Sequence, residues 1–318
     1  MVTVPTALRQ PPAALKIREL PALLVLTLAL VWLFATKSSF RTPENLSQVG
    51  LQIGLLGILA MGEGLVILTG GIDLSVGAVL AMSACVAGAR MSAGTPWPVA
   101  VIMALAVGAL GGFINGALIT YRKLTPILTT LSTLLVFRAL TNIWTGAIPY
   151  NQLPEGFNKL GRGQMPFLFF LVVVSLFAVG LARSRFGRRV VAVGGSEQSA
   201  RLSGVPTDAI IRRVYVAAGL CAALAGLLMS AGANNAQWNL GEGWELEVIA
   251  AVVIGGVRLT GGEGSLIGAA IGAAIIVVLR NALFLSGVPT DQYGLITGAV
   301  IIIAALTEQF RRAREAKA

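Results

Sequence analysis

The chain contains no histidine, only two cysteines and few charged residues. Asp, Glu, Lys and Arg make up 12% of its 318 residues, whereas 56% are hydrophobic and the mean hydropathy is +0.81. The missing histidine excludes His-based proton relays, the common zinc sites and Ser-His-Asp triads. Cys85 and Cys221 fall in apolar stretches, where small core residues are expected rather than a disulfide or a metal site. We therefore expect no metal in this chain.

Enzymatic chemistry also lacks its usual residues. No Gly-Lys dipeptide occurs, so the phosphate-binding loop of ATPases is absent from the sequence. No paired acids, nucleophile with a base or metal-ligand cluster is visible. We expect a chain that is not an enzyme and holds no cofactor of its own.

Long apolar stretches dominate what is present. A transmembrane helix needs ~20 mostly apolar residues. The sequence therefore predicts an all-α polytopic membrane protein with about ten transmembrane helices, some of them short or broken at Gly-Gly pairs. The predicted helices cover residues 20–36, 46–69, 74–92, 97–120, 124–145, 166–183, 214–233, 246–257, 265–285 and 292–310.

The net charge of +10 predicts a topology rather than a nucleic-acid partner. With both termini in the cytoplasm, most of the 24 Lys and Arg residues lie on that side, as the positive-inside rule requires. The outer segments hold Lys37, Arg41, Lys159 and Arg162. We expect a cytoplasmic segment at 1–19, a transmembrane domain at 20–310 and a basic cytoplasmic tail at 311–318. No small-residue cleavage site follows Phe34, so the first apolar stretch is expected to stay uncleaved.

The run LVILTGGIDLSVGAVLA, residues 65–81, interrupts two apolar stretches with two glycines and Asp73. A carboxylate and irregular backbone at membrane depth are tolerated only inside protein or along a water-filled cavity. The run therefore predicts a translocation pathway. We expect this pathway to be lined by polar residues in or beside the apolar stretches: Glu63, Asp73, Ser75, Asn115, Arg138, Asn234, Asn235 and Arg258.

A second double glycine suggests an internal repeat. Residues 70–75 can be aligned with residues 255–260, which pairs Gly70 with Gly255. The alignment predicts an ion pair between Asp73 and Arg258; chance matching is the alternative in a chain with 38 glycines. Two further runs of glycine at every fourth position predict close helix packing: Gly108, Gly112 and Gly116, and Gly264, Gly268 and Gly272. Arg138 and Arg280, as cations within apolar stretches, need a partner, water or a route to the interface.

The longest polar stretch, residues 184–213, is too short for a catalytic domain. Its pattern predicts a turn at Gly194 and Gly195, then a short helix capped by Ser196 and ended near Gly204. Such a helix suits docking into another protein; an ordinary basic loop is the alternative. The predicted docking residues are Gly194, Gly195, Ser196, Glu197, Ala200, Arg201 and Gly204.

Three motifs carry a resemblance over about residues 46–310: GGIDLSVG, FGRRVVAVGGSEQSARLSGV, and GEGWELEVIAAVVIGGVRLTGGEGSLIGAAIGA with LRNALFLSGV. In this order they resemble the permease subunit of ribose-type ATP-binding-cassette sugar importers. The resemblance implies a multi-pass permease of the bacterial inner membrane that translocates a monosaccharide. A cytoplasmic ATPase carrying ATP and Mg, a periplasmic or lipid-anchored sugar-binding protein and a second permease copy would be its partners, and 184–213 its coupling loop.

Two departures and two alternatives accompany this interpretation. Ser196 stands where relatives often have asparagine, and Glu63 where an uncharged residue is expected. An ion-coupled secondary transporter would use acids at midplane or nearer the outer surface. Its candidates are Glu63, Asp73, Glu242, Glu245, Glu247 and Asp291. A membrane-embedded enzyme is the second alternative.

Overall fold

The computed structural model describes residues 19–289, 292–296 and 298–299, and these are mostly helical. The elements in chain order are α1 (Leu20–Thr36), η1 (Ser38–Arg41), α2 (Pro43–Leu68), α3 (Val76–Ser92), α4 (Trp97–Tyr121), α5 (Pro126–Thr145), β1 (Tyr150–Asn151), α6 (Glu155–Asn158), η2 (Lys159–Gly161), α7 (Met165–Arg183), α8 (Arg185–Gly195), α9 (Glu197–Leu202), α10 (Thr207–Ala233), β2 (Asn235–Ala236), α11 (Trp244–Ile254) and α12 (Leu266–Leu285).

A helix occupies each of the first nine predicted stretches; most of the tenth, 292–310, lies outside the described residues. Six of these helices are long and apolar enough to cross a membrane: α2, α4, α5, α7, α10 and α12. α1 and α3 are apolar but have 17 residues each, and α11 has 11. The chain is therefore a polytopic, all-α membrane protein.

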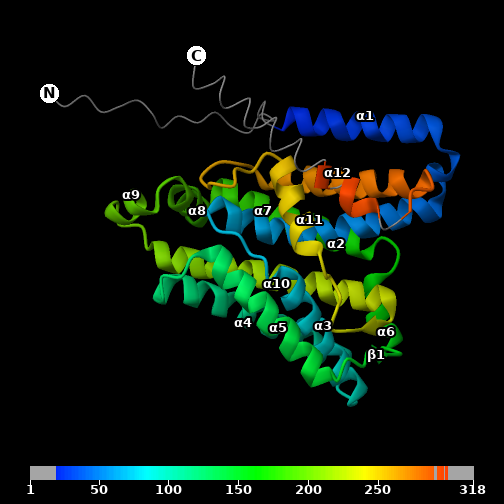
Figure 1. Cartoon of the computed structure of the whole chain (residues 1–318), viewed down its shortest axis with the longest axis horizontal. Coiled ribbons are helices and arrows are strands. Elements are labelled where there is room, and N and C mark those ends of the chain that lie inside the picture. The colour runs from blue at the N-terminus through cyan, green and yellow to red at the C-terminus, as the bar shows by residue number, and fades with distance from the viewer. Residues whose placement is uncertain (1–18, 290–291, 297, 300–318) are drawn as a thin grey trace.

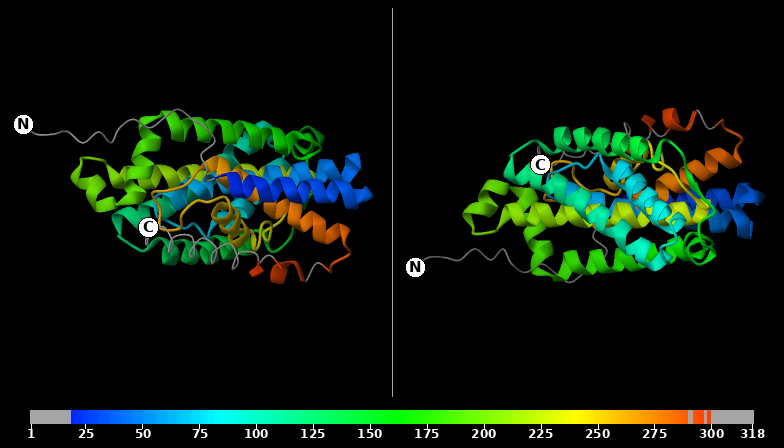
Figure 2. Two further views of the ribbon diagram at one scale, coloured as in Figure 1. Left: turned by 90° about the horizontal axis from the view of Figure 1, so that it is seen from above. Right: turned by 90° about the horizontal axis from the view of Figure 1, so that it is seen from below.

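The core surrounds two long helices, α2 and α10. In α2, 83% of the most apolar window is buried inside the protein, and in α10 72%, whereas the value for α7 is 11%. In the views of Figure 2, α7 and α5 lie on opposite sides of α10. The outer helices leave large apolar side chains exposed, as lipid contact requires, while α2 and α10 build the protein interior.

Glycine brings α4 against α10. A Cβ added to Gly112 would overlap the backbone carbonyl of Tyr215, and one added to Gly116 would lie 2.8 Å from the Cα of Arg212. Gly108 faces Gly219 in the same way. These contacts leave no room for a side chain, so the glycines permit the close backbone approach.

The second glycine run is only partly helical. Gly268 and Gly272 lie in α12 and face the backbone of α11. Gly264 precedes α12, whose N-cap is Ser265, and has a φ of +145°. Its prediction as a member of the helical ridge was wrong, because Gly264 lies in the loop before α12, where a Cβ added to it would lie 2.7 Å from the Cα of Val257.

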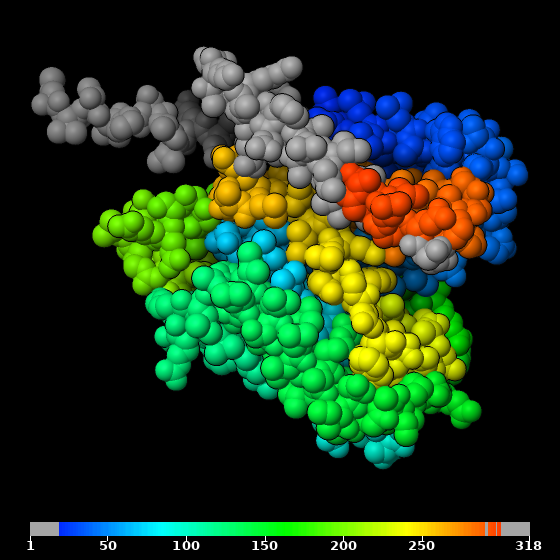
Figure 3. Space-filling model, viewed as in Figure 1, coloured from blue at the N-terminus to red at the C-terminus, as the bar shows by residue number. Residues whose placement is uncertain are grey.

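The two ends of the helical body differ in structure. At one end, β1 pairs antiparallel with β2, Tyr150 opposite Ala236. α8 and α9 lie at the opposite end (Figure 1). In the space-filling view they form a protrusion from the described surface (Figure 3). A polar segment that projects from an apolar body is accessible to a soluble partner.

Candidate functional site

The backbone break after α2 ends in a helix-terminating turn. Gly70 has a φ of +81° and donates to the carbonyl of Ile67 at 2.9 Å, while Gly71 donates to Val66 at 3.1 Å. This pattern is the glycine C-cap, in which a left-handed residue satisfies the last helical carbonyls. The chain then crosses to α3 in irregular backbone that is buried at Gly71 and Asp73.

The break after α11 repeats this turn in a different register. Gly256 has a φ of +83° and donates to Val253 at 2.9 Å, and Val257 donates to Val252 at 3.2 Å. Gly256 is therefore the equivalent of Gly70, and the predicted pairing of Gly70 with Gly255 was wrong by one residue. The two Gly-Gly pairs suggested aligning Gly70 with Gly255. The left-handed residue is, however, the first glycine of the pair at 70–71 and the second glycine of the pair at 255–256.

Asp73 organises a buried polar cluster at the first break. Its Oδ1 accepts the backbone N–H of Ser75 at 2.8 Å and the Ser75 hydroxyl at 2.6 Å. Asn115 of α4 donates Nδ2 to the Ser75 hydroxyl at 2.7 Å and, more weakly, to Asp73 at 3.5 Å. Asp73 thereby forms an Asx-type turn that fixes the start of α3.

Two further helices join this cluster. Thr133 of α5 donates its hydroxyl to Asn115 Oδ1 at 2.7 Å, and Thr130 donates to the carbonyl of Ile72 at 3.0 Å. Glu63 of α2 accepts the backbone N–H of Asp73 at 3.1 Å. The cluster therefore connects α2, α4 and α5 around the break.

The Asp73 cluster is closed to solvent. Glu63, Ser75 and Asn115 are 0% exposed and Asp73 is 2% exposed. Within the described part of the chain, Glu63 Oε2 and the Tyr215 hydroxyl have no hydrogen-bond partner. A Cβ on Gly71 would lie 2.7 Å from that hydroxyl, so α10 also abuts the break. Four predicted pathway residues, Glu63, Asp73, Ser75 and Asn115, thus meet at one place.

The predicted pathway residue Arg258 lies elsewhere. It forms an ion pair with Glu263 at 3.0 Å, within its own loop. The predicted Asp73–Arg258 ion pair was wrong, because each residue has its partners locally: Asp73 takes the donors of Ser75, two positions away, and Arg258 takes Glu263, five away.

Asn234 and Asn235 belong to the end opposite α9. Asn234 ends α10 at a φ of +53°, and its Oδ1 accepts the N–H of Leu153 at 3.0 Å and the Asn158 amide at 2.8 Å. Asn235 pairs with Asn151 between β2 and β1. Both residues hold the β1–β2 end together and lie outside the Asp73 cluster.

Arg138 and Arg280, the two arginines within apolar stretches, have partners in neighbouring elements. Arg138 of α5 donates to the carbonyls of Trp238 at 2.8 Å and Leu240 at 2.9 Å. Arg280 of α12 pairs with Glu247 of α11 at 2.7 Å. Each arginine therefore ties a helix to the segment around α11.

The polar segment after α7 contains two helices where one was predicted. Gly194 and Gly195 end α8, so the predicted turn at these glycines was wrong; the chain turns at Ser196, whose φ is −166°. The hydroxyl of Ser196 accepts the N–H of Ser199 at 3.2 Å and so caps α9. Gly204 follows α9 with a φ of +79°.

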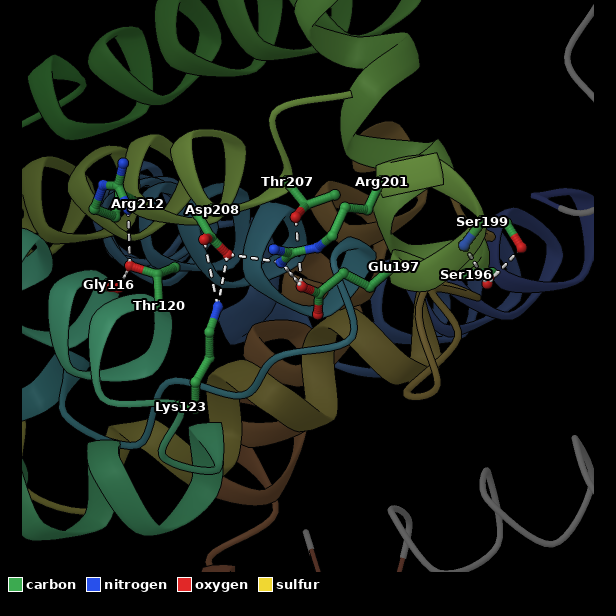
Figure 4. A network of polar contacts seen from close by, with 10 residues as sticks. All are labelled: Gly116, Thr120, Lys123, Ser196, Glu197, Ser199, Arg201, Thr207, Asp208 and Arg212. Atoms are coloured by element: carbon green, nitrogen blue, oxygen red, sulfur yellow. Dashed lines mark hydrogen bonds and ion pairs between the residues drawn. The ribbon is translucent and has the colours of Figure 1, made fainter. Parts of the chain in front are cut away.

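Ion pairs attach α9 to the helical body (Figure 4). Arg201 binds Glu197 at 2.7 Å and Asp208 at 2.9 Å, and Lys123, between α4 and α5, binds Asp208 at 3.1 Å. The hydrogen bonds from Arg201 to Glu197 and Asp208 raise the pKa of its guanidinium. Displacement of α9 would therefore act on α10 and on the α4–α5 connection.

Sequence reasoning missed several of these residues. From the sequence, Lys123 counts only as one of the cytoplasmic cations, Asp208 is not singled out, and Thr133 falls within an apolar stretch. Leu202 was also missed; it is the last residue of α9, and its side chain is 83% exposed. A polar residue inside an apolar stretch was the only signal for Thr133, and an apolar one inside a polar stretch for Leu202.

A many-helix membrane body with a buried polar break and a polar segment at one end is the architecture that the sequence predicts for a transport permease. The family model of the branched-chain amino acid transport system permease component matches residues 45–305, and the chain belongs to this permease family. The ribose import permease of Bacillus subtilis (strain 168) is 38% identical over 282 residues, covering 86% of this chain and 88% of the relative.

Other relatives have similar coverage. The ribose import permease of Escherichia coli (strain K12) is 37% identical, covering 89% of this chain and 91% of its own length. The autoinducer 2 import system permease of Salmonella typhi is 34% identical, covering 90% and 84%. No solved structure is significantly similar to the chain. Because the family description names amino acids and these relatives do not, family membership alone leaves the substrate open.

Proposed function

We propose that this chain is the permease subunit of an ATP-binding-cassette importer that moves a monosaccharide, ribose or a related sugar, across the bacterial inner membrane. The observation that carries the proposal is identity of 37–38% with ribose import permeases over most of both chains. A separate ATPase supplies the energy, a periplasmic or lipid-anchored binding protein delivers the sugar, and a second copy of this permease completes the pathway. The chain itself performs no chemistry on the substrate.

The α8–α9 segment, residues 185–202, is the proposed docking site for the ATPase. α8 buries Gly187, Val190 and Val193 against the body and leaves its arginines exposed. α9 buries only Ala200. Its other side chains, including Leu202, are available to a partner, and the ion pair of Arg201 with Asp208 connects α9 to α10. Because α9 protrudes, is capped by Ser196 and is ion-paired to α10, movement of a bound ATPase would displace α9 and act on α10.

The Asp73 cluster is the proposed moving part of the pathway. Its hydrogen bonds are closed to solvent, and they join a helix break to three helices. Breaking and remaking such a set converts rotation of the helices into opening or closing of the path at the break. The hydroxyl and amide groups of Ser75, Asn115 and Thr133 can donate to and accept from the hydroxyl groups of a sugar.

Ion coupling is less well supported by the same contacts. Two of the acids that could bind a coupling ion are engaged: Asp73 accepts from Ser75, and Glu247 pairs with Arg280. Glu63 keeps one oxygen without a partner among the described residues. An ion-coupled transporter would also leave the projecting α8–α9 segment without a role.

Purification in mild detergent from the native membrane, followed by mass spectrometry, tests the proposed assembly. We expect an ATPase with a phosphate-binding loop at about one copy per permease. Leu202→Asp, which removes the exposed apolar side chain at the end of α9, should reduce the amount of bound ATPase without reducing the amount of permease. Leu176→Ala, on the exposed face of α7, is the control for a lipid-facing leucine. Recovery of the permease alone, with uptake abolished by a protonophore and unaffected by ATP depletion, would contradict the proposal.

A further inference from the structure

A glycine-rich contact joins α8 to both backbone breaks. The loop of residues 258–264, between α11 and α12, lies between the end of α8 and the end of α2. In the space-filling view this loop, coloured gold, adjoins the α8–α9 protrusion (Figure 3). Three segments far apart in sequence therefore meet within a few residues of the Asp73 cluster.

The contact begins with a helix carbonyl that the α2 break leaves free. In an uninterrupted helix the carbonyl of Leu68 would accept from residue 72, but α2 ends at Leu68. Instead, Gly262 of the 258–264 loop donates its N–H to Leu68 at 3.0 Å. The second break therefore satisfies a terminal carbonyl of the first.

α8 packs directly on this hydrogen bond. A Cβ added to Gly194 would overlap the Leu68 carbonyl and the Gly262 nitrogen. One added to Gly262 would lie 2.7 Å from the Cα of Gly195, and one added to Gly261 would lie 2.7 Å from the nitrogen of Gly70. Three backbones thus touch without intervening side chains, so displacement of one displaces the others.

The loop itself is braced. Arg258 donates its N–H to the carbonyl of Glu263 at 2.9 Å and forms an ion pair with its side chain at 3.0 Å. Gly261 and Gly262 have φ values of +83° and +76°, which a side chain would strain. A braced loop transmits displacement, where a slack one would absorb it.

We infer that the contact of Gly194 with Leu68 and Gly262 transmits movement of the α8–α9 segment to the α2–α3 break, so that Gly194 is a positioning residue for transport. The inference rests on the proposed ATPase docking. Gly194 touches neither substrate nor nucleotide in this account. It sets where the end of α2, and with it the Asp73 cluster, lies when α8 moves.

Gly180 provides a control outside the proposed docking site. It lies near the end of α7, as Gly194 lies near the end of α8, and a Cβ added to it would meet no described atom within 4 Å. Gly194→Ala and Gly180→Ala therefore make the same change in a helix and differ in whether the new methyl group enters the contact. Both variants should retain the ATPase in equal amounts.

The test uses the full complex in proteoliposomes, with ribose as the probe, and measures ribose uptake per ATP hydrolysed. We expect Gly194→Ala to lower this ratio about tenfold, within the range of coupling energies between sites, and Gly180→Ala to leave it unchanged. An unchanged ratio in an assembled Gly194→Ala complex would overturn the inference and leave the proposed function intact. Absence of ATP-driven uptake by the wild-type complex would overturn both.

A second measurement avoids substitution in the contact, in case Gly194→Ala fails to assemble. Spin labels are placed at Val191→Cys on α8, Leu259→Cys in the loop and Ile143→Cys at the far end of α5, all exposed; the native Cys85 and Cys221 are buried. We expect the distance between 191 and 259 to be the same in nucleotide-free and ATP-trapped complexes, while that between 259 and 143 changes. A change between 191 and 259 as large as that between 259 and 143 would overturn the inference.

Discussion

Replacement of Asp73 tests whether the buried cluster holds the α2–α3 break. Asp73→Ala leaves two buried donors of Ser75 without their acceptor: the backbone N–H and the hydroxyl hydrogen. Leaving a buried donor unsatisfied costs ~1–3 kcal/mol, so two cost about 2–6 kcal/mol. Because native proteins are stable by only ~5–15 kcal/mol, this is a large fraction of the total. We expect less folded protein and a clearly lower thermal midpoint.

Two further variants separate the cap from the charge. Asp73→Asn keeps Oδ1 as the acceptor for both Ser75 donors, so its midpoint should lie between those of wild type and Asp73→Ala. Asp208→Ala makes the same chemical change in a side chain that is 34% exposed, where ion pairs contribute only ~0.2–1 kcal/mol each. It should lower the midpoint least.

The assay is heating of the detergent-purified permease followed by size-exclusion chromatography of the remaining monodisperse protein. The transition is expected to be irreversible, so midpoints are compared at one heating rate. A midpoint for Asp73→Ala no lower than that for Asp208→Ala would refute the assignment of Asp73 as the cap of the break. Equal losses in Asp73→Ala and Asp73→Asn would show that the charge matters and the hydrogen-bond geometry does not.

Three other predictions use the same preparations. Gly112→Ala should destabilise the permease by about 1–3 kcal/mol, because the methyl group enters the α4–α10 contact, whereas Gly180→Ala, which meets nothing within 4 Å, should be neutral in the thermal assay. Arg280→Ala should cost up to ~3 kcal/mol because it leaves the half-buried Glu247 unpaired, and adding Glu247→Gln should restore part of the lost midpoint; no recovery would contradict the pairing. Arg201→Ala should change the thermal midpoint little, because its ion pairs are exposed, yet it should lower ribose uptake per ATP hydrolysed in proteoliposomes; normal uptake per ATP would remove the Arg201–Asp208 ion pair from the mechanism.

Much of the fold could be predicted because a continuous apolar run in the sequence predicts a membrane helix. The first predicted stretch coincides with α1, and the bounds of α4 and α12 differ from prediction by one residue. α10 begins at Thr207 rather than 214, because its first two turns carry Asp208 and Arg212 and face partners outside the apolar core. Hydropathy identifies only the apolar part of a helix.

The candidate site was predictable in its members and unpredictable in its connections. Polar residues in apolar stretches pointed to Asp73 and Asn115, and the structure brings these two together across 42 positions of sequence. Nothing in one sequence indicates that Asn115 bonds to this cluster, whereas Asn234 bonds to Leu153 and Asn158, 81 and 76 positions away. The wrong partner predicted for Arg258 has the same cause. Charge complementarity alone allows either Asp73 or Glu263, and only the structure shows that Arg258 pairs with Glu263.

The contact at Gly194 shows a third kind of limit. Glycine in a polar segment predicts a turn, yet Gly194 is helical and is small because the end of α2 occupies the place of its side chain. The adjacent Gly195 has the same local sequence context and an open environment. Only the packing of three distant segments separates the two residues.

The most direct test of the account is sugar uptake by a defined complex. The permease, its copurified ATPase and the binding protein are reconstituted in proteoliposomes without an ion gradient, and radiolabelled ribose uptake is measured with ATP or a non-hydrolysable analogue on the ATPase side. If the permease is part of an ATP-driven sugar importer, we expect ribose to accumulate with ATP and not with the analogue. Accumulation that follows an imposed proton or sodium gradient and ignores ATP would contradict it.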